Sequence, residues 1–114
     1  MTKKLLFGLF CIVLASCATQ KPLYTWYNYG QTTYDYLKKN DEESLNKLIT
    51  EYQKIIKLQK GTRKVPPPGV YADYGFLLLQ ANRTEEGKQM LEMEMTNYPE
   101  SKIFIERILK MMED

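Results

Sequence analysis

Residues 70–100 read VYADYGFLLLQANRTEEGKQMLEMEMTNYPE, and this stretch decides the fold of the chain. Val70–Ala81 is apolar nearly all round, which predicts a central helix. Thr84, followed by two glutamates, is expected to cap a second helix. Pro99 stops that helix, since proline cannot continue it. The stretch therefore predicts two helices joined by a tight turn.

The same residues resemble the tetratricopeptide pattern, in which helix pairs stack into a superhelix. The matching positions are Tyr71, Tyr74, Gly75, Leu78, Gly87, Leu91 and Pro99. Gly75 is expected to let the first helix approach the second closely, with Gly87 facing it. Glu94 stands where that pattern has alanine, so this copy is degenerate.

The residues before this stretch predict an earlier helix pair. Tyr24–Lys39 reads as an aromatic-rich helix, in which Trp26, Tyr29 and Gly30 repeat the spacing that begins at Tyr71. Asn40 and Glu43 then have the spacing of a capping box. A second helix follows, with an apolar strip at three- and four-residue steps: Leu45, Leu48, Ile49, Tyr52, Ile55, Ile56 and Gln59.

Gly61 suits the position just after this helix, and Gly61–Gly69 contains three successive prolines. We expect a rigid connector between the helix pairs. The alternative is a proline-rich ligand for a partner.

Ser101 is expected to cap a fifth helix that closes the array. One apolar stripe is predicted on it, made of Phe104, Ile105, Ile108, Leu109 and Met112. The fold expected for residues 24–114 is all-α, with about five helices in antiparallel pairs forming a short tetratricopeptide-like superhelix.

Residues 1–16 read as a secretory signal peptide, with a basic start and an apolar run too short to span a bilayer, which takes roughly 20 residues. Leu14-Ala15-Ser16-Cys17 resembles the lipobox of bacterial lipoproteins. The resemblance implies cleavage before Cys17, with a diacylglyceryl group on its thiol and an N-acyl chain. Residues 17–23 then form a short linker.

Ala18, rather than aspartate, follows the cysteine. By resemblance to lipoprotein sorting, this favours the outer membrane. The lack of an acidic cluster after it favours the periplasmic face.

Composition excludes several kinds of chemistry. The chain has no histidine, Cys11 leaves with the leader, and Cys17 carries lipid. We therefore expect no metal site and no cofactor besides the lipid. Loss of Lys3 and Lys4 with the leader leaves equal numbers of basic and acidic residues, so no nucleic-acid partner is expected.

The whole chain after the leader is similar to a family of uncharacterised bacterial outer-membrane lipoproteins, that of domain of unknown function 4810. The resemblance lies in the Trp- and Tyr-rich opening, Val65–Gly75 and Tyr98–Ser101. It implies an accessory subunit typically encoded beside a lipoprotein resembling the curli secretion channel. That lipoprotein, or another of the envelope, is the partner it suggests.

A partner is expected on the concave face, which the first helix of each pair lines in tetratricopeptide arrays. The residues that map there are Tyr24, Tyr27, Gln31, Tyr34, Ala72, Phe76, Leu79 and Gln80. Such a strip suits an extended peptide or a helix. The alternative is that these side chains are core.

Three functions follow from these patterns. The first is a lipid-anchored adapter that binds a protein partner. The second is a structural envelope lipoprotein that self-associates through its tyrosine-rich first helix. A remote third is a small cell-wall hydrolase using Glu42 with Glu43, or Glu92 with Glu94, all expected at exposed positions. We expect no enzyme activity and no small-molecule substrate.

Overall fold

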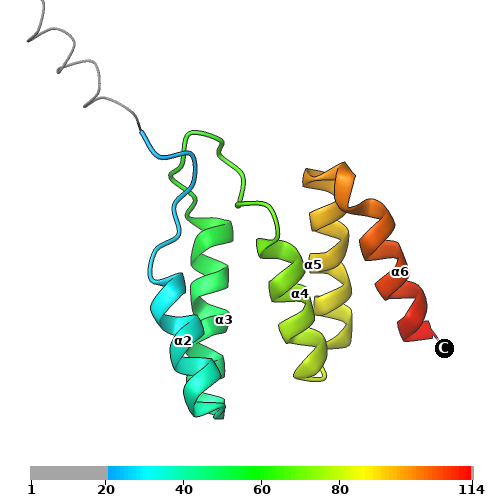
Figure 1. Cartoon of the computed structure of the whole chain (residues 1–114), viewed down its shortest axis with the longest axis horizontal. Coiled ribbons are helices and arrows are strands. Elements are labelled where there is room, and N and C mark those ends of the chain that lie inside the picture. The colour runs from blue at the N-terminus through cyan, green and yellow to red at the C-terminus, as the bar shows by residue number, and fades with distance from the viewer. Residues whose placement is uncertain (1–20, 114) are drawn as a thin grey trace, which may run out of the picture.

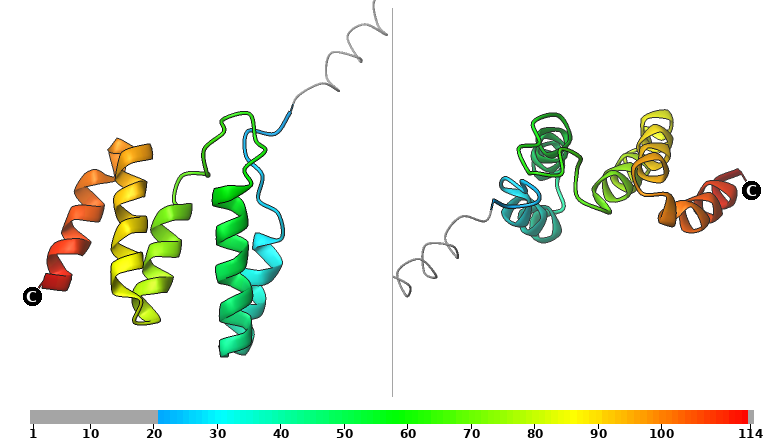
Figure 2. Two further views of the ribbon diagram at one scale, coloured as in Figure 1. Left: turned by 180° about the vertical axis from the view of Figure 1, so that it is seen from behind. Right: turned by 90° about the horizontal axis from the view of Figure 1, so that it is seen from above.

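The computed structural model describes residues 21–113, which form helices without any strand. The elements in chain order are α2 (Tyr29–Lys39), α3 (Glu42–Lys57), α4 (Val70–Gln80), α5 (Thr84–Asn97), the 3-10 turn η1 (Pro99–Ser101) and α6 (Lys102–Glu113). Helices α2 and α3 form one antiparallel pair, α4 and α5 a second, and α6 follows (Figures 1 and 2). The all-α prediction with paired helices is confirmed. None of these described helices is both long and apolar enough to cross a bilayer.

The signal peptide 1–16, the lipidation site Cys17 and the linker up to residue 20 lie outside the described residues. Those parts of the sequence analysis stay predictions.

Helices α4 and α5 meet at two glycines. A Cβ built on Gly75 would lie 2.9 Å from the carbonyl oxygen of Gly87 and 3.0 Å from the Leu91 side chain. A Cβ on Gly87 would lie 2.8 Å from the Leu79 side chain. These separations are shorter than van der Waals contact, so only glycine lets the two backbones come this close. The close approach predicted at this pair is confirmed.

A ladder of aromatic rings links the first helix pair to α4. The ring of Tyr29 lies 5.6 Å from that of Tyr52 on α3, edge to face, and Tyr52 stacks on Tyr74 of α4 at 5.2 Å. Tyr52 and Tyr74 are buried in a core with Leu48, Ile55 and Leu78. Burial, and then the neighbouring Tyr29 hydroxyl, raise the pKa of Tyr52, so its phenol stays neutral. Aromatic contacts of this kind add about 0.5–1.5 kcal/mol beyond the area they bury.

The first helix begins later than predicted, at Tyr29 rather than Tyr24. Tyr27 has a φ of 48°, which a helix does not accept, and its hydroxyl donates to the carbonyl of Leu58. Gly30 has open space around its Cβ position, so it does not repeat the packing of Gly75. The spacing shared by the two glycines thus has a packing role only in the second pair.

Three predicted caps are also wrong in detail. Asp41, not Asn40, caps α3: its carboxylate accepts from the Ser44 amide at 2.8 Å, and Ser44 completes the capping box in place of Glu43. Asn40 ends α2 with a left-handed φ of 48° instead. Thr84 is the first helical residue of α5, after Arg83 at the cap position.

At the start of α6, Ser101 belongs to η1 rather than capping the helix. Its hydroxyl donates to the carbonyl of Tyr98 at 2.7 Å.

The loop between α3 and α4 is pinned to the body. Pro66 and Pro67 are buried. The Tyr98 hydroxyl donates to the Pro66 carbonyl at 2.6 Å, and the Gly69 amide donates to the Glu94 carboxylate at 2.5 Å. This supports the connector interpretation, because a proline segment held in this way is not free to serve as a ligand.

Candidate partner-binding face

The helices form two rows, which decides what each face can present. Seen from above, α3 and α5 lie along one side, α2 and α6 lie along the other, and α4 lies between the rows (Figure 2). The concave face was expected to be lined by the first helix of each pair. Those helices are α2 and α4, with α6 as the first helix of the unfinished unit.

The four predicted residues of the first unit do not form part of one strip. Tyr24 and Tyr27 precede α2 and belong to the segment that crosses the end of α3. Gln31 donates to Asp35 at 2.8 Å on the exposed side of α2. Tyr34 is 58% exposed, with the Lys38 ammonium 5.9 Å from its ring centre. Gln31 and Tyr34 are surface groups, whereas Tyr24 is half-buried, and Thr32 is the buried residue of α2.

The residues of the second unit are mostly core. Ala72 is buried against Leu91 and Ile105, and Phe76 and Leu79 pack on the same cluster. Gln80 is exposed. The structure therefore brings Ala72, Phe76 and Leu79 together but separates them from the tyrosines of α2. The alternative that these side chains are core holds for Ala72.

An apolar face that the sequence analysis missed lies along α6. Phe104, which belongs to the predicted apolar stripe, is 60% exposed. Ile103 is 68% exposed and Met111 is 69% exposed. Only Ile105 is buried on this helix, with Ile108 and Leu109 packed partly against the core. Phe104 and Met111 are seven residues apart, which places them on one side of a helix. A search for a second apolar stripe would have found this signal.

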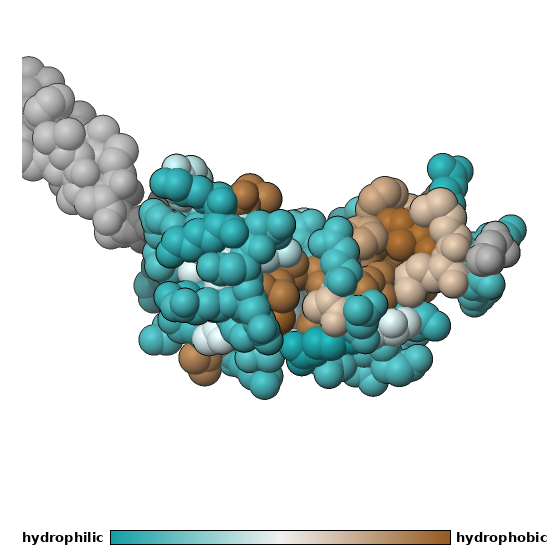
Figure 3. All heavy atoms as spheres, turned by 90° about the horizontal axis from the view of Figure 1, so that it is seen from below, coloured by the Kyte–Doolittle hydropathy of each residue, from teal (hydrophilic) through white to brown (hydrophobic). Residues whose placement is uncertain are grey.

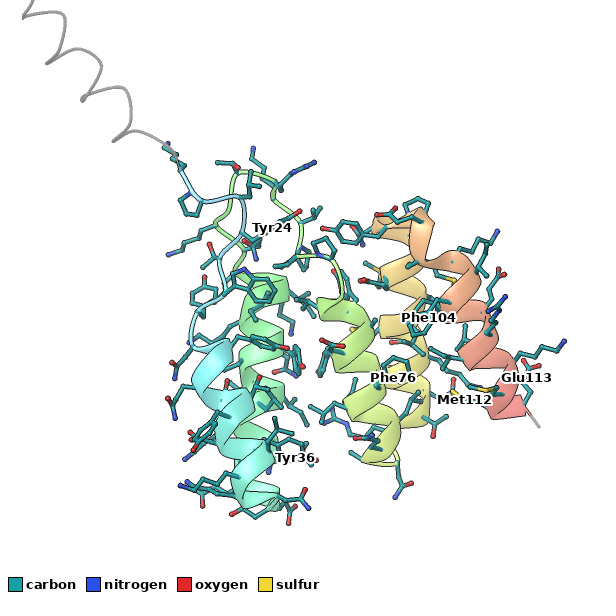
Figure 4. The ribbon with its side chains drawn as sticks, in the orientation of Figure 1. Tyr24, Tyr36, Phe76, Phe104, Met112 and Glu113 are labelled. Carbon is teal, nitrogen blue, oxygen red and sulfur yellow. The ribbon has the colours of Figure 1, made fainter. Side chains whose placement is uncertain are left out.

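Phe76 links this stripe to α4. Phe76, Phe104 and Met112 lie between α4 and α6 (Figure 4). We define the α4–α6 face as Phe76, Phe104, Ile108, Met111 and Met112. From below, apolar side chains gather over the C-terminal half, whereas hydrophilic ones cover α2 and α3 (Figure 3).

Glu94 was expected to be exposed but is 3% exposed. One of its oxygens accepts from the Gly69 amide, and the other, Oε2, has no hydrogen-bond partner. Burial raises the pKa of Glu94, the Gly69 amide opposes this, and the charges of Asp73 and Glu100 add to it. The group fixes the start of α4, and it does not pair with Glu92, which is exposed.

A polar groove of about 460 Å³ runs between the start of α2 and α3 and is lined by Thr32, Asn46, Thr50 and their neighbours. Its buried carboxylate, Glu51, is already partnered. One oxygen accepts from the Asn28 amide at 3.2 Å, and the other lies 3.5 Å from the Lys54 ammonium. Within residues 21–113, no three His, Cys, Asp or Glu side chains are grouped as a metal ion would need.

These features define an all-helical protein of two packed helix pairs and a final helix with one uncovered apolar side. The chain belongs to the family described as "Domain of unknown function (DUF4810)", whose model matches residues 23–108. No curated protein and no solved structure matches it.

Proposed function

We propose that this protein is a lipid-anchored accessory subunit of the bacterial outer membrane that binds another envelope protein through its α4–α6 face. The lipobox-like sequence ending at Cys17 supports the anchor. The paired helices and the Gly75–Gly87 contact support a short tetratricopeptide-like array. Such arrays act by presenting surfaces to other proteins.

The observation that carries the proposal is the exposure of α6. Helix α4 is covered by α3 on one side and by α5 on another, and its aliphatic side chains are largely buried. Helix α6 packs against α5 and η1, and it leaves Ile103, Phe104 and Met111 in solvent. Full burial of each such side chain would contribute about 1.5–3 kcal/mol to the free energy of binding, which favours a partner on this face.

A helix from the partner fits this face best. In this fold a helix that packs beside another covers its apolar stripe, whereas Phe104 and Met111 of α6 are exposed. The partner helix would lay its own apolar side along Phe104 and Met111. The family resemblance suggests a lipoprotein similar to the curli secretion channel as its source.

Site-specific photo-crosslinking in the intact envelope tests this proposal. A crosslinking residue at Phe104, and separately at Phe76, is expected to give the same heterologous adduct. Glu85, exposed in the first turn of α5, serves as the control and is expected to give none. The absence of any adduct at Phe104 in the folded, anchored protein would contradict the proposal.

Self-association is a second candidate, and a separate observation favours it. Tyr34 and Leu37 lie three residues apart on the outer side of α2, 58% and 75% exposed. A crosslinker at Tyr34 that gives adducts only between copies of this chain, with none at Phe104, would establish this second function in place of the first.

A further inference from the structure

The end of the body from which the chain leads to Cys17 is built around a close contact. The segment from Pro22 to Thr25 lies against the loop after α3, with the Thr62 amide donating to the Pro22 carbonyl at 3.2 Å and the Arg63 amide to the Leu23 carbonyl at 3.3 Å. A Cβ on Gly61 would lie less than 3.0 Å from the Leu23 backbone. Glycine at this position is thus needed for the opening segment to lie beside the loop after α3 (Figure 1), and the bond to Pro22 holds the adjoining Lys21 near that loop.

Both segments that meet at this end lack acidic residues. No aspartate or glutamate occurs in residues 21–34 or 52–72, although the chain as a whole carries 14. We define the basic end by its five exposed cations, which are Lys21, Lys57, Lys60, Arg63 and Lys64. The described ion pairs involve none of these five. Glu51, just before the second segment, is buried and lies near Lys54.

Two leucines add an apolar component among these cations. Leu23 is 55% exposed and Leu58 is 56% exposed, although each lies next to backbone that is hydrogen-bonded. Exposed apolar side chains interspersed with lysine and arginine are what a protein surface needs to bind a lipid interface. The cations attract anionic headgroups, and the leucines enter the boundary beneath them.

We propose that the basic end binds the anionic surface of the membrane in which Cys17 is anchored. That the basic end is brought to this membrane rests on the lipid anchor of the proposed function. That the basic end binds anionic lipid does not depend on the anchor. Only a few residues separate Lys21 from Cys17, and each spans at most about 3.6 Å. The anchor therefore delivers the basic end, and no other end, to the headgroups.

The contact orients the body. An acyl anchor alone leaves the domain free to turn, whereas a chain plus a basic patch fixes it more firmly. In the row of helices, α6 lies at the opposite end from the point where residue 21 enters (Figure 1). The α4–α6 face is then held away from the anchoring point and remains open to a partner.

Two fluorescent labels on one helix and its loop test the orientation in the lipid-anchored protein. Cysteine is placed at Thr62, in the loop, or at Glu42, in the first turn of α3, and is labelled with an environment-sensitive dye. These sites are separated by the length of α3, about 1.5 Å per residue. With phosphatidylglycerol in the vesicles, the label at 62 is expected to shift to shorter wavelength and to be quenched by brominated lipid. The label at 42 is expected to do neither.

The charge dependence is tested on the chain that begins at residue 17 and carries Cys17→Ser. Both hydrophobic clusters are made of residues 29–109, so this form retains the folded body. Its partitioning onto phosphatidylglycerol vesicles is expected to fall about fivefold for each cation of the basic end that is removed. The test variant combines Lys57→Gln, Lys60→Gln, Arg63→Gln and Lys64→Gln. The matched control combines Lys38→Gln, Lys39→Gln, Lys88→Gln and Lys110→Gln, and it is expected to lose much less.

The outcomes separate this inference from the anchor. Equal losses in the two variants, or equal partitioning onto pure phosphatidylcholine, would overturn the role of the basic end. A mass spectrum of the envelope protein that shows no lipid on Cys17 would overturn the anchor alone. The inference would then still stand or fall on the vesicle binding of the unlipidated chain.

Discussion

The two helix pairs are held together by different means. In α4 and α5 the backbones touch at Gly75 and Gly87, and no side chain separates them there. In α2 and α3 a Cβ added at Gly30 would meet open space. This pair is joined through Tyr29 and Tyr52 together with the hydrogen bond from the Asn28 amide to Glu51. The same spacing in the sequence thus occurs in two helix pairs that pack differently. The α4–α5 contact leaves no room for added atoms, whereas the α2–α3 contact depends on large side chains.

The largest effect is expected at the ring that links the pairs. Tyr52→Ala removes the centre of the ladder from a site that is 4% exposed, and it should cost about 3–5 kcal/mol of the free energy of unfolding. Urea unfolding followed by Trp26 fluorescence reports the first pair, and far-UV circular dichroism reports all helices. We expect the fluorescence transition to move to lower urea than the circular dichroism transition.

Tyr34→Ala is the matched control for that change, because its ring is exposed. It should alter stability by no more than about 0.5 kcal/mol. Two transitions that remain superimposed in Tyr52→Ala, with a shift as small as that of the control, would show that the ladder does not couple the pairs.

The glycines give the most direct contrast between the pairs. Gly75→Ala pushes a methyl group against the Gly87 carbonyl and the Leu91 side chain, and it should cost about 1–3 kcal/mol. Gly30→Ala adds the same methyl group in open space within a helix, and it should stabilise by about 0.4–1 kcal/mol. Denaturant midpoints of the two variants measure this difference. A loss of stability in both would mean that the two glycines are equivalent after all.

An effect no larger than that of Gly75→Ala is expected where the opening segment meets the first pair. Gly61→Ala should displace Leu23 and break the hydrogen bonds of Thr62 and Arg63 with the segment, at about 0.5–1.5 kcal/mol each. Release of the segment would shift the emission of Trp26, the one tryptophan of the chain, to longer wavelength. Thr62→Ala, at an exposed neighbour, should leave emission unchanged. An unshifted spectrum in Gly61→Ala would show that the segment does not depend on this glycine.

The smallest effect concerns the second pair and depends on pH. The pKa of Glu94 in the folded protein is raised by burial above the ordinary value of 4.5. Glu94 therefore contributes most to the free energy of unfolding below pH 4.5, where it is protonated in both states. This contribution is lost as the pH rises through the pKa of the folded protein. Glu94→Gln keeps the acceptor for the Gly69 amide but cannot ionise, so it should be more stable than the wild type at pH 7 and equal to it in acid. Glu92→Gln, at an exposed position, is the control. Parallel pH profiles for the wild type and Glu94→Gln would contradict this assignment.

The sequence predicted the helices well because their apolar periods are long. The stretch from Leu45 to Ile56 and the apolar run in α4 both fold as expected, since burying a helix face dominates the local energetics. The predicted helix ends were wrong where two neighbouring polar residues could each serve as the cap. Asp41 and Asn40 are both good caps, and their choice depends on how α2 ends. Tyr27 was predicted to be helical but lies before α2. Its hydroxyl donates to the Leu58 carbonyl, a contact between residues far apart in the sequence that local patterns do not indicate.

The candidate face was predicted less well than the fold. Mapping by analogy placed tyrosines of the first unit beside Phe76, but that mapping assumed a helix beginning at Tyr24. Phe104 was predicted to lie in one apolar stripe with Ile105, but it is 60% exposed, whereas Ile105, about 100° further round the helix, is buried. Glu94 shows the converse error. Glu94 was predicted to be exposed because it is charged. It is buried, and the Gly69 amide donates a hydrogen bond to its carboxylate.

The two hydrogen bonds between the opening segment and the loop after α3 also decide how tension enters the protein. A pull along the chain at Lys21 reaches Pro22 and Leu23 first, and both are bonded to the loop. The load therefore passes to the end of α3 before it can peel the first turn of α2. Gln59 adds a further attachment, since its side-chain amide donates to the Thr25 carbonyl at 3.1 Å. The body is thus clamped at its entry point, and a pull at Lys21 loads these hydrogen bonds before it reaches the helices.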